Sequence, residues 1–192
     1  MIDGILTPAF LQAAGRAGKK KENVILLTAG SSTNSIREIT CSGAGKILYI
    51  ENGENKQIDF VGDLGDTAIL PDTGTIVEVV GNISAIKLAN TGWTLVDTTN
   101  SALLTNLLSL TLVNTKILKI GASVSNLTKD SAPSRIEEVY YAANNSSVSA
   151  TLADWITNSN FSNGVLHTDS DGAYYSTIAD AATAKGWTIE QL

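Results

Sequence analysis

An internal repeat in the second half of the chain constrains the possible folds more than any other feature of the sequence. Two sets of residues have the same internal spacing and lie 24 positions apart: Ile83, Ile86, Leu88 and Asn90, followed by Leu107, Leu110, Leu112 and Asn114. A third set begins 29 positions later: Ile136, Val139, Tyr141 and Asn144. Val165 and Trp187 occupy matching positions in two less regular copies. Because such a unit can bury its apolar face only against its neighbours, the repeat predicts stacked units.

The repeat also has the features of a known family. In the two regular copies the L-x-x-L-x-L segment is expected to form a strand, and asparagine to close the next turn with its side-chain amide. The stretch from about residue 81 to 192 resembles the irregular leucine-rich-repeat proteins of anaerobic gut bacteria and their phages. It departs from their pattern at Asn90 and Asn114, which come one residue early, and at Tyr141, which replaces a leucine. The resemblance implies a short solenoid that displays side chains for binding.

Two helices are expected between the later strands. Apolar residues recur at helical spacing in two stretches: Val148, Leu152, Trp155 and Ile156, then Tyr174, Ile178, Ala181 and Ala182. We expect Ser147 to cap the first helix and Asp171 the second, which should end at Lys185-Gly186. The three tryptophans fall at apolar-periodic or strand positions: Trp93, Trp155 and Trp187. We therefore expect them in the core rather than on a sugar-binding surface.

The first 80 residues follow another pattern. Short β-type runs separated by glycine and polar turns occupy 24–27, 36–39, 47–50, 57–61 and 75–80. They predict an antiparallel sheet or small sandwich over residues 23–80, with a tight hairpin at Asn52-Gly53. Within residues 1–22, Thr7-Pro8 is expected to open a short helix that leads into a basic cluster.

Composition excludes several classes of function. The net charge of −6 disfavours nucleic acid and anionic membranes as partners, since both require a surplus of Lys and Arg. Cys41 is the single cysteine and His167 the single histidine, so neither an internal disulfide nor a Cys/His zinc site can form. The sequence shows no signal peptide and no membrane span.

Catalytic and cofactor motifs fail on inspection. Gly43-Ala-Gly45-Lys46 lacks the first glycine and the Ser/Thr of a phosphate-binding loop, so a β-turn is the better interpretation. The stretch 167–172 resembles a calcium loop, but isoleucine stands at 178, where a bidentate glutamate is required. Nothing near His167 in the sequence would orient it as a general base. We expect no cofactor, no metal and no enzymatic activity.

We therefore predict an α+β chain with three parts: a helical arm at 1–22, a β-rich module at 23–80 and a leucine-rich-repeat-like solenoid at 81–192. The residues expected to contact a ligand or partner are Lys87, Thr111, Glu138, Tyr140 and His167. Those expected to form an assembly arm are Phe10, Leu11, Arg16, Lys19, Lys20 and Lys21.

The predicted function is that of a non-catalytic structural or interaction protein. The expected partners are proteins, either further copies of the chain or neighbours in a larger assembly such as a phage virion, and a glycan stays possible. The absence of a signal peptide favours a virion over a cell surface. One alternative is a bacterial surface module for adhesion or ligand binding. A weaker alternative is a carboxylate-dependent hydrolase, because the chain has acidic residues that could act as a catalytic pair. Their spacing does not distinguish them from ordinary surface acids.

Overall fold

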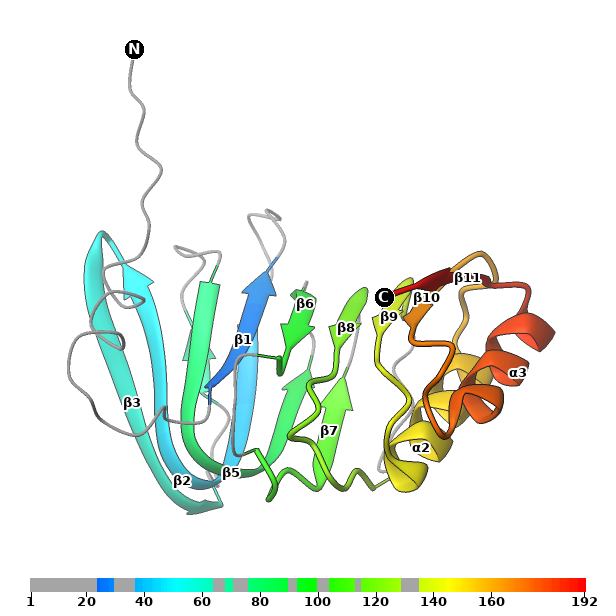
Figure 1. The fold of residues 1–192 in the computed structure, drawn as a ribbon. Helices are drawn as coiled ribbons and strands as arrows, with labels where there is room; N and C mark the ends of the chain where they lie inside the picture. The colour runs from blue at the N-terminus through cyan, green and yellow to red at the C-terminus, as the bar shows by residue number, and fades with distance from the viewer. Residues whose placement is uncertain are drawn as a thin grey trace.

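The computed structural model describes residues 24–29, 37–63, 68–70, 76–89, 93–99, 104–112, 115–128 and 135–192. Strand accounts for 50% of the structure and helix for 18%. The strands are β1 (Val24–Ala29), β2 (Arg37–Glu51), β3 (Glu54–Asp63), β4 (Ala68–Leu70), β5 (Ile76–Ala89), β6 (Trp93–Asp97), β7 (Ser109–Leu112), β8 (Ile117–Lys119), β9 (Glu138–Tyr140), β10 (Val165–Thr168) and β11 (Thr188–Gln191). The helices are α2 (Ser146–Asn158) and α3 (Tyr175–Lys185). Together the strands form one mixed sheet of 11 strands, with β3 and β11 at its edges (Figure 1).

The N-terminal strands pair in antiparallel fashion, as the sequence predicts. β2 and β3 form a hairpin in which Glu51 lies opposite Glu54. The two turn residues both have positive φ, 51° at Asn52 and 80° at Gly53. This is the turn that an Asn-Gly pair favours, because its twist matches that of the strands. The predicted hairpin is therefore confirmed.

The two longest strands, β2 and β5, curve together (Figure 1). Gly45 lies opposite Gly81 in their register, and Gly81 has a φ of +132°. A Cβ atom at Gly45 would collide with the carbonyl of Val80, and one at Gly81 with the carbonyl of Ala44. Glycine at both positions therefore permits a close approach of the two backbones that no other residue allows.

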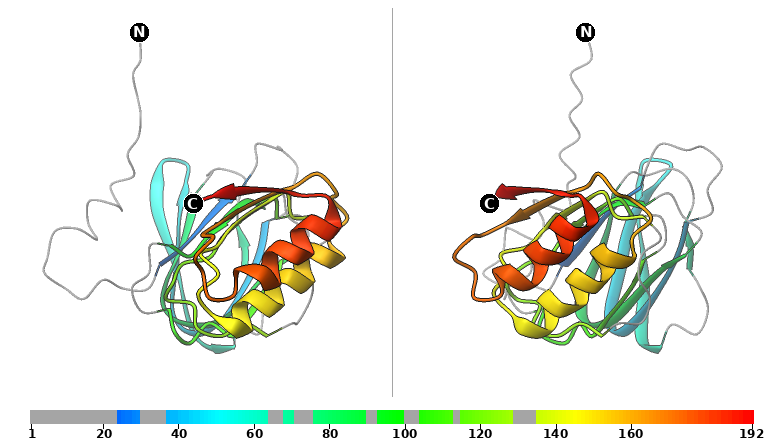
Figure 2. Two further views of the ribbon diagram at one scale, coloured as in Figure 1. Left: turned by 45° about the vertical axis from the view of Figure 1, so that its right-hand side comes forward. Right: turned by 90° about the vertical axis from the view of Figure 1, so that its right-hand side faces the viewer.

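Beyond β1 the sheet becomes parallel. β6, β8, β9, β10 and β11 pair side by side, and the residue that each contributes to the inner row lies beside its neighbour's: Val96, Leu118, Val139, Leu166 and Ile189. A second parallel pair joins β5 to β7, with Ile86 opposite Leu110 and Leu88 opposite Leu112. The 24-residue spacing of the sequence repeat is thus the register of the β5–β7 pair. Helices α2 and α3 pack against each other at the C-terminal end of the molecule (Figure 2).

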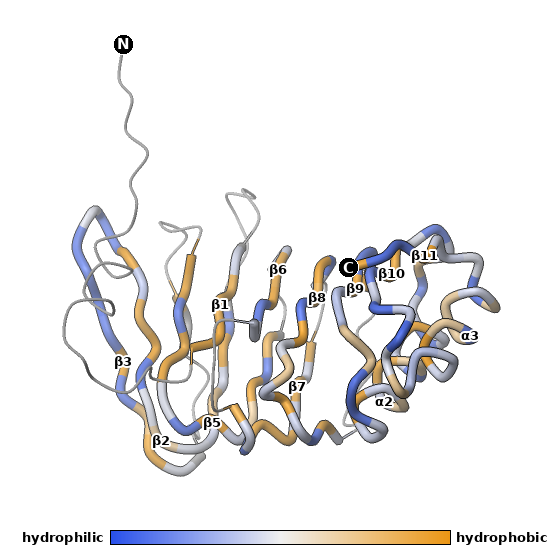
Figure 3. The backbone as a smooth tube through the Cα atoms, in the orientation of Figure 1, coloured by the Kyte–Doolittle hydropathy of each residue, from blue (hydrophilic) through white to orange (hydrophobic). Residues whose placement is uncertain are grey.

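One hydrophobic cluster runs through the structure, from Ile25 on β1 to Trp187 beside β11. Trp93 and Trp155 are fully buried and Trp187 is 5% exposed, so the prediction of core tryptophans is confirmed. Hydrophilic residues are frequent on both edge strands, and hydrophobic segments recur along the strands between them (Figure 3). No described helix is both apolar enough and long enough to span a membrane.

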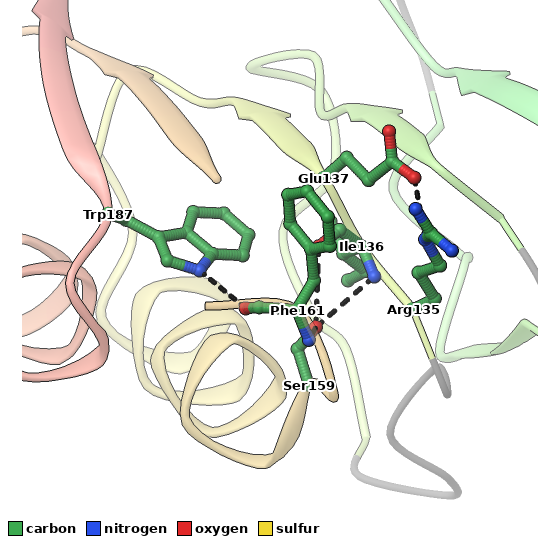
Figure 4. Close-up of polar contacts among 6 residues, drawn as sticks. All are labelled: Arg135, Ile136, Glu137, Ser159, Phe161 and Trp187. Carbon is green, nitrogen blue, oxygen red and sulfur yellow. Dashed lines mark hydrogen bonds and ion pairs between the residues drawn. The ribbon is translucent and has the colours of Figure 1, made fainter. Parts of the chain in front are cut away.

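Polar bonds join successive passes of the chain near α2. Ser159 is buried, and its hydroxyl lies 3.3 Å from both the backbone N and O of Ile136 (Figure 4). The same hydroxyl accepts a bond of 3.2 Å from the backbone N–H of Phe161. Trp187 donates its indole N–H to the carbonyl of Phe161 at 2.9 Å. These bonds fix the segment that leads from α2 into β10.

The predicted fold class is wrong. The chain is mostly one large mixed β-sheet, not an α+β solenoid with a helical arm. The physical reason is strand pairing between the two halves: β1 pairs with β6, and β5 continues to Ala89 and pairs with β7. The expected repeat strands are thereby part of the same sheet as the N-terminal strands. The arm, residues 1–22, lies outside the described residues.

Local details of the repeat prediction also need correction. The third repeat copy matches Val139 with Leu110, but β9 pairs with β8, so Val139 lies beside Leu118. The last two copies match Val165 with Trp187, but Val165 lies beside Thr188. Helix α2 is capped by Asn145, whose side chain accepts a bond from the N–H of Val148, and not by Ser147. Helix α3 has no side-chain cap at its start, so Asp171 does not fill that role. Its predicted end is confirmed, because Gly186 has the left-handed conformation that glycine favours.

Candidate functional site on the outer face of the sheet

One row of side chains runs across the outer face of the sheet. Each member lies beside the next on the neighbouring strand, so the row crosses nine strands without a break. From β3 to β11 the row consists of Gln57, Leu48, Glu78, Leu26, Asp97, Lys119, Tyr140, His167 and Glu190. Because successive strand residues point to opposite faces of the sheet, the side chains of this row lie on the face opposite to the inner row.

The C-terminal part of the row forms a cluster of charged and aromatic side chains. Tyr140 and His167 stack with their ring centroids 4.0 Å apart and their planes 6° apart. The ammonium of Lys119 lies 4.7 Å from the centroid of the Tyr140 ring. Because Lys119 comes from β8 and His167 from β10, the two groups cover opposite faces of Tyr140.

Two carboxylates complete the cluster. Glu190 places Oε2 at 3.4 Å from Nδ1 of His167, an ion pair when the imidazole is protonated. The hydroxyl of Tyr140 donates to Oε2 of Glu138 at 3.1 Å. We call Lys119, Glu138, Tyr140, His167 and Glu190 the outer cluster. Its members come from four adjacent strands and hold each other in place.

The environment of Tyr140 keeps its phenol protonated. Burial is the main cause of its raised pKa, and the hydrogen bond to Glu138 and the negative charges of Glu138 and Glu190 act in the same direction. The phenol is therefore a hydrogen-bond donor at neutral pH. A neutral, partnered phenol positions groups but is not an activated nucleophile or base.

The stacking decides what the outer cluster can bind. A sugar ring is bound by an exposed aromatic face, and both faces of Tyr140 are covered. What the cluster presents outward are ring edges and charged groups at the spacing of neighbouring strands, about 4.8 Å. This arrangement suits polar and charged groups of a partner better than the flat face of a sugar.

The other part of the row combines two leucines with polar and acidic side chains: Gln57, Leu48, Glu78, Leu26 and Asp97. Leu26 and Leu48 are partly exposed, with Glu78 between them in the register. No hydrogen bond or ion pair joins the carboxylate of Glu78 to another described residue, and burial alone raises its pKa. Next in the row, Asp97 is satisfied within the chain, since it accepts bonds from the backbone and hydroxyl of Thr99.

The single cysteine and the single histidine both lie in the described part of the chain. Burial raises the pKa of Cys41 to about 12, so its thiol is protonated and unreactive at neutral pH. His167 contacts Tyr140 and Glu190, and no described serine or threonine hydroxyl is bonded to it. No group of three or more His, Cys, Asp or Glu side chains in the described part of the chain could hold a metal ion.

The structure separates the five predicted contact residues into two places. Glu138, Tyr140 and His167 come together in the outer cluster. Lys87 and Thr111 lie opposite each other on β5 and β7, in the second parallel pair. The six predicted arm residues, Phe10, Leu11, Arg16, Lys19, Lys20 and Lys21, lie outside the described residues.

Sequence reasoning missed Lys119 and Glu190. Lys119 lies 21 positions before Tyr140, and Glu190 lies 23 positions after His167. Both distances fall in the range of the repeat, so alignment of every copy strand by strand would have found them. The repeat pattern does not give Lys119 because it matches Val139 with Leu110 instead of Leu118. It does not give Glu190 because it matches Val165 with Trp187 instead of Thr188.

Comparison of the chain with protein-family models, with curated proteins and with solved structures found no match in any of the three.

Proposed function

We propose that this chain is a non-catalytic interaction protein, a subunit of a larger assembly such as a phage virion, which contacts a neighbouring protein through the outer face of its sheet. The observation that carries this proposal is the continuous outer row. It joins partly exposed apolar side chains to a fixed set of charged groups, and such a mixture is typical of protein interfaces.

The geometry of the outer cluster supports contact rather than reaction. Its side chains are held by stacking and hydrogen bonds, so little conformational entropy is lost when a partner binds. Rigid aromatic side chains are also the residues that contribute most to binding at interfaces. The resemblance to irregular leucine-rich-repeat proteins stays a proposal as well, supported by the 24-residue spacing at which Ile86 pairs with Leu110.

A photocrosslinking experiment tests the proposal. A benzophenone amino acid is placed at Ile117, a partly exposed residue of the outer face, and in a matched variant at Thr177, an exposed residue of α3. Both full-length variants are irradiated in the cells that make the protein. We expect one adduct of defined mass from Ile117 and none from Thr177.

The mass of the adduct identifies the kind of neighbour. A dimer of this chain indicates a homo-oligomer, and a foreign capsid or tail protein indicates a virion. A host surface protein would replace the virion by the adhesion function. No adduct from Ile117, or equal adducts from both positions, would show that the outer face is not an interface.

A further inference from the structure

Strand β11 leaves one edge of the sheet open. Its other edge is paired in parallel with β10: Thr188 donates its backbone N–H to Gly164 at 2.9 Å, and Leu192 donates to Thr168 at 3.2 Å. Backbone groups of successive strand residues point to opposite edges. The N–H and C=O groups of Ile189 and Gln191 therefore point away from β10, and no described strand pairs with them.

The inner row is incomplete at this edge. Val139 and Leu166 are fully buried within it, because each has a strand on both sides. Ile189, the next member, packs against the core but is only partly buried. A further strand with an apolar side chain at this level would complete the row and bury Ile189.

A positive charge beside the outer row would be favourable at the same edge. It ends at Glu190, whose side chain is 56% exposed and whose charged contact within the described chain is with His167. Opposite charges on neighbouring strands are stabilising and like charges are destabilising. A residue beside Glu190 on an added strand is therefore favoured when it is lysine or arginine.

A second copy of the chain does not supply this pattern from its described edges. In one arrangement, the β11 strands of two copies pair in antiparallel fashion with their Ile189 residues opposite each other. Glu190 of each copy would then face Thr188 of the other. If β11 paired with β3 so that Ile189 faced the inward Ile58, Glu190 would face Gln57 or Asp59. Neither arrangement places a cation beside Glu190.

We propose that β11 accepts an extended segment of a partner protein as an added strand, with an apolar side chain beside Ile189 and a lysine or arginine beside Glu190. The inference rests on the proposed function and names the mode and chemistry of one contact. Strand addition gives affinity through main-chain hydrogen bonds and specificity through alternate side chains.

The test uses the full-length protein and three synthetic peptides of about eight residues, the length of a typical strand. The first alternates valine with lysine, the second contains the same residues in two blocks, and the third alternates valine with glutamate. Amide hydrogen exchange is followed by NMR. We expect the first peptide to slow exchange at Ile189 and Gln191 at least about tenfold, with little change at Thr188 and Glu190, whose N–H groups already face β10.

A charge-swap variant tests the side-chain pattern. In Glu190→Lys we expect the affinity for the valine-lysine peptide to fall about two- to fivefold, which is the size of a cross-strand charge effect. We expect the affinity for the valine-glutamate peptide to rise. The control is Glu54→Lys, which makes the same charge change on the opposite edge strand and should leave both affinities unchanged.

The inference is overturned if no peptide protects Ile189 and Gln191, or if the block peptide protects them equally. Protection that appears without peptide and grows with protein concentration would identify a second copy as the occupant, which also overturns it. If crosslinking from Ile117 succeeds while the peptides fail, the proposed function stands and this inference alone is lost.

Discussion

Two stacked rings give the outer cluster its shape, and their coupling can be measured. Tyr140 and His167 lie on adjacent strands with nearly parallel planes. Aromatic pairs of this kind contribute about 0.5–1.5 kcal/mol beyond the area that they bury. We expect a double-mutant cycle of Tyr140→Ala and His167→Ala, measured by urea unfolding, to give a coupling energy in this range. Tyr140→Phe, which keeps the ring, should retain most of the coupling, and strictly additive effects would contradict the stacked arrangement.

Glu78 lies between two leucines, and its raised pKa makes a prediction about pH. A carboxyl group whose pKa is higher in the folded chain favours folding at low pH, and this contribution is lost as the pH rises through the folded pKa. At neutral pH the charged, partly buried Glu78 is therefore unfavourable. We expect Glu78→Gln to raise the free energy of unfolding at pH 7 by about 0.5 kcal/mol or less, and the gain to vanish well below the ordinary pKa of 4.5.

Urea unfolding at several pH values checks this prediction. Glu54→Gln is the control, since Glu54 is exposed on β3. A destabilising Glu78→Gln at neutral pH would show that Glu78 has a favourable partner in the folded chain.

The curved pair of β2 and β5 depends on glycine at one point of close contact. Gly81→Ala would both place a side chain at a φ of +132° and drive its Cβ into the carbonyl of Ala44. Gly53→Ala is the matched control, because Gly53 also has a positive φ but open space around it. We expect a loss of about 1 kcal/mol at Gly53 and at least about 2 kcal/mol more at Gly81, measured by urea unfolding. Equal losses would mean that the two strands do not approach closely at Gly81.

The whole molecule has one contiguous core, which includes residues of β1 and of the turn before β11. Strand pairing continues from the antiparallel strands to the parallel ones through β1 and β6. We therefore expect a single cooperative unfolding transition, with coincident midpoints by tryptophan fluorescence and by far-UV circular dichroism. The fluorescence reports on Trp93, Trp155 and Trp187, and the dichroism on the whole sheet. Two separate transitions would indicate that the antiparallel and parallel strands unfold independently.

The sequence alone was sufficient for features that depend on neighbouring residues. Asn52-Gly53 predicts its hairpin because both residues tolerate positive φ, and Gly186 ends α3 for the same reason. The spacing between Ile86 and Leu110 predicts their pairing because both residues must face one core. Most of the strands and the burial of the tryptophans follow from such local and periodic signals.

Only the tertiary structure decided how distant segments meet. The identity of the strand beside β9 depends on which loops close and which apolar faces remain to be covered, and several alignments of the repeat satisfy the sequence equally well. Because β9 pairs with β8 and not with β7, Lys119 lies beside Tyr140. Because β11 pairs with β10, Glu190 lies beside His167. The sequence therefore predicts three of the five residues of the outer cluster, those on β9 and β10, because strand alternation places them on the outer face. Their partners on β8 and β11 depend on the strand register, which is set by the packing of the whole chain.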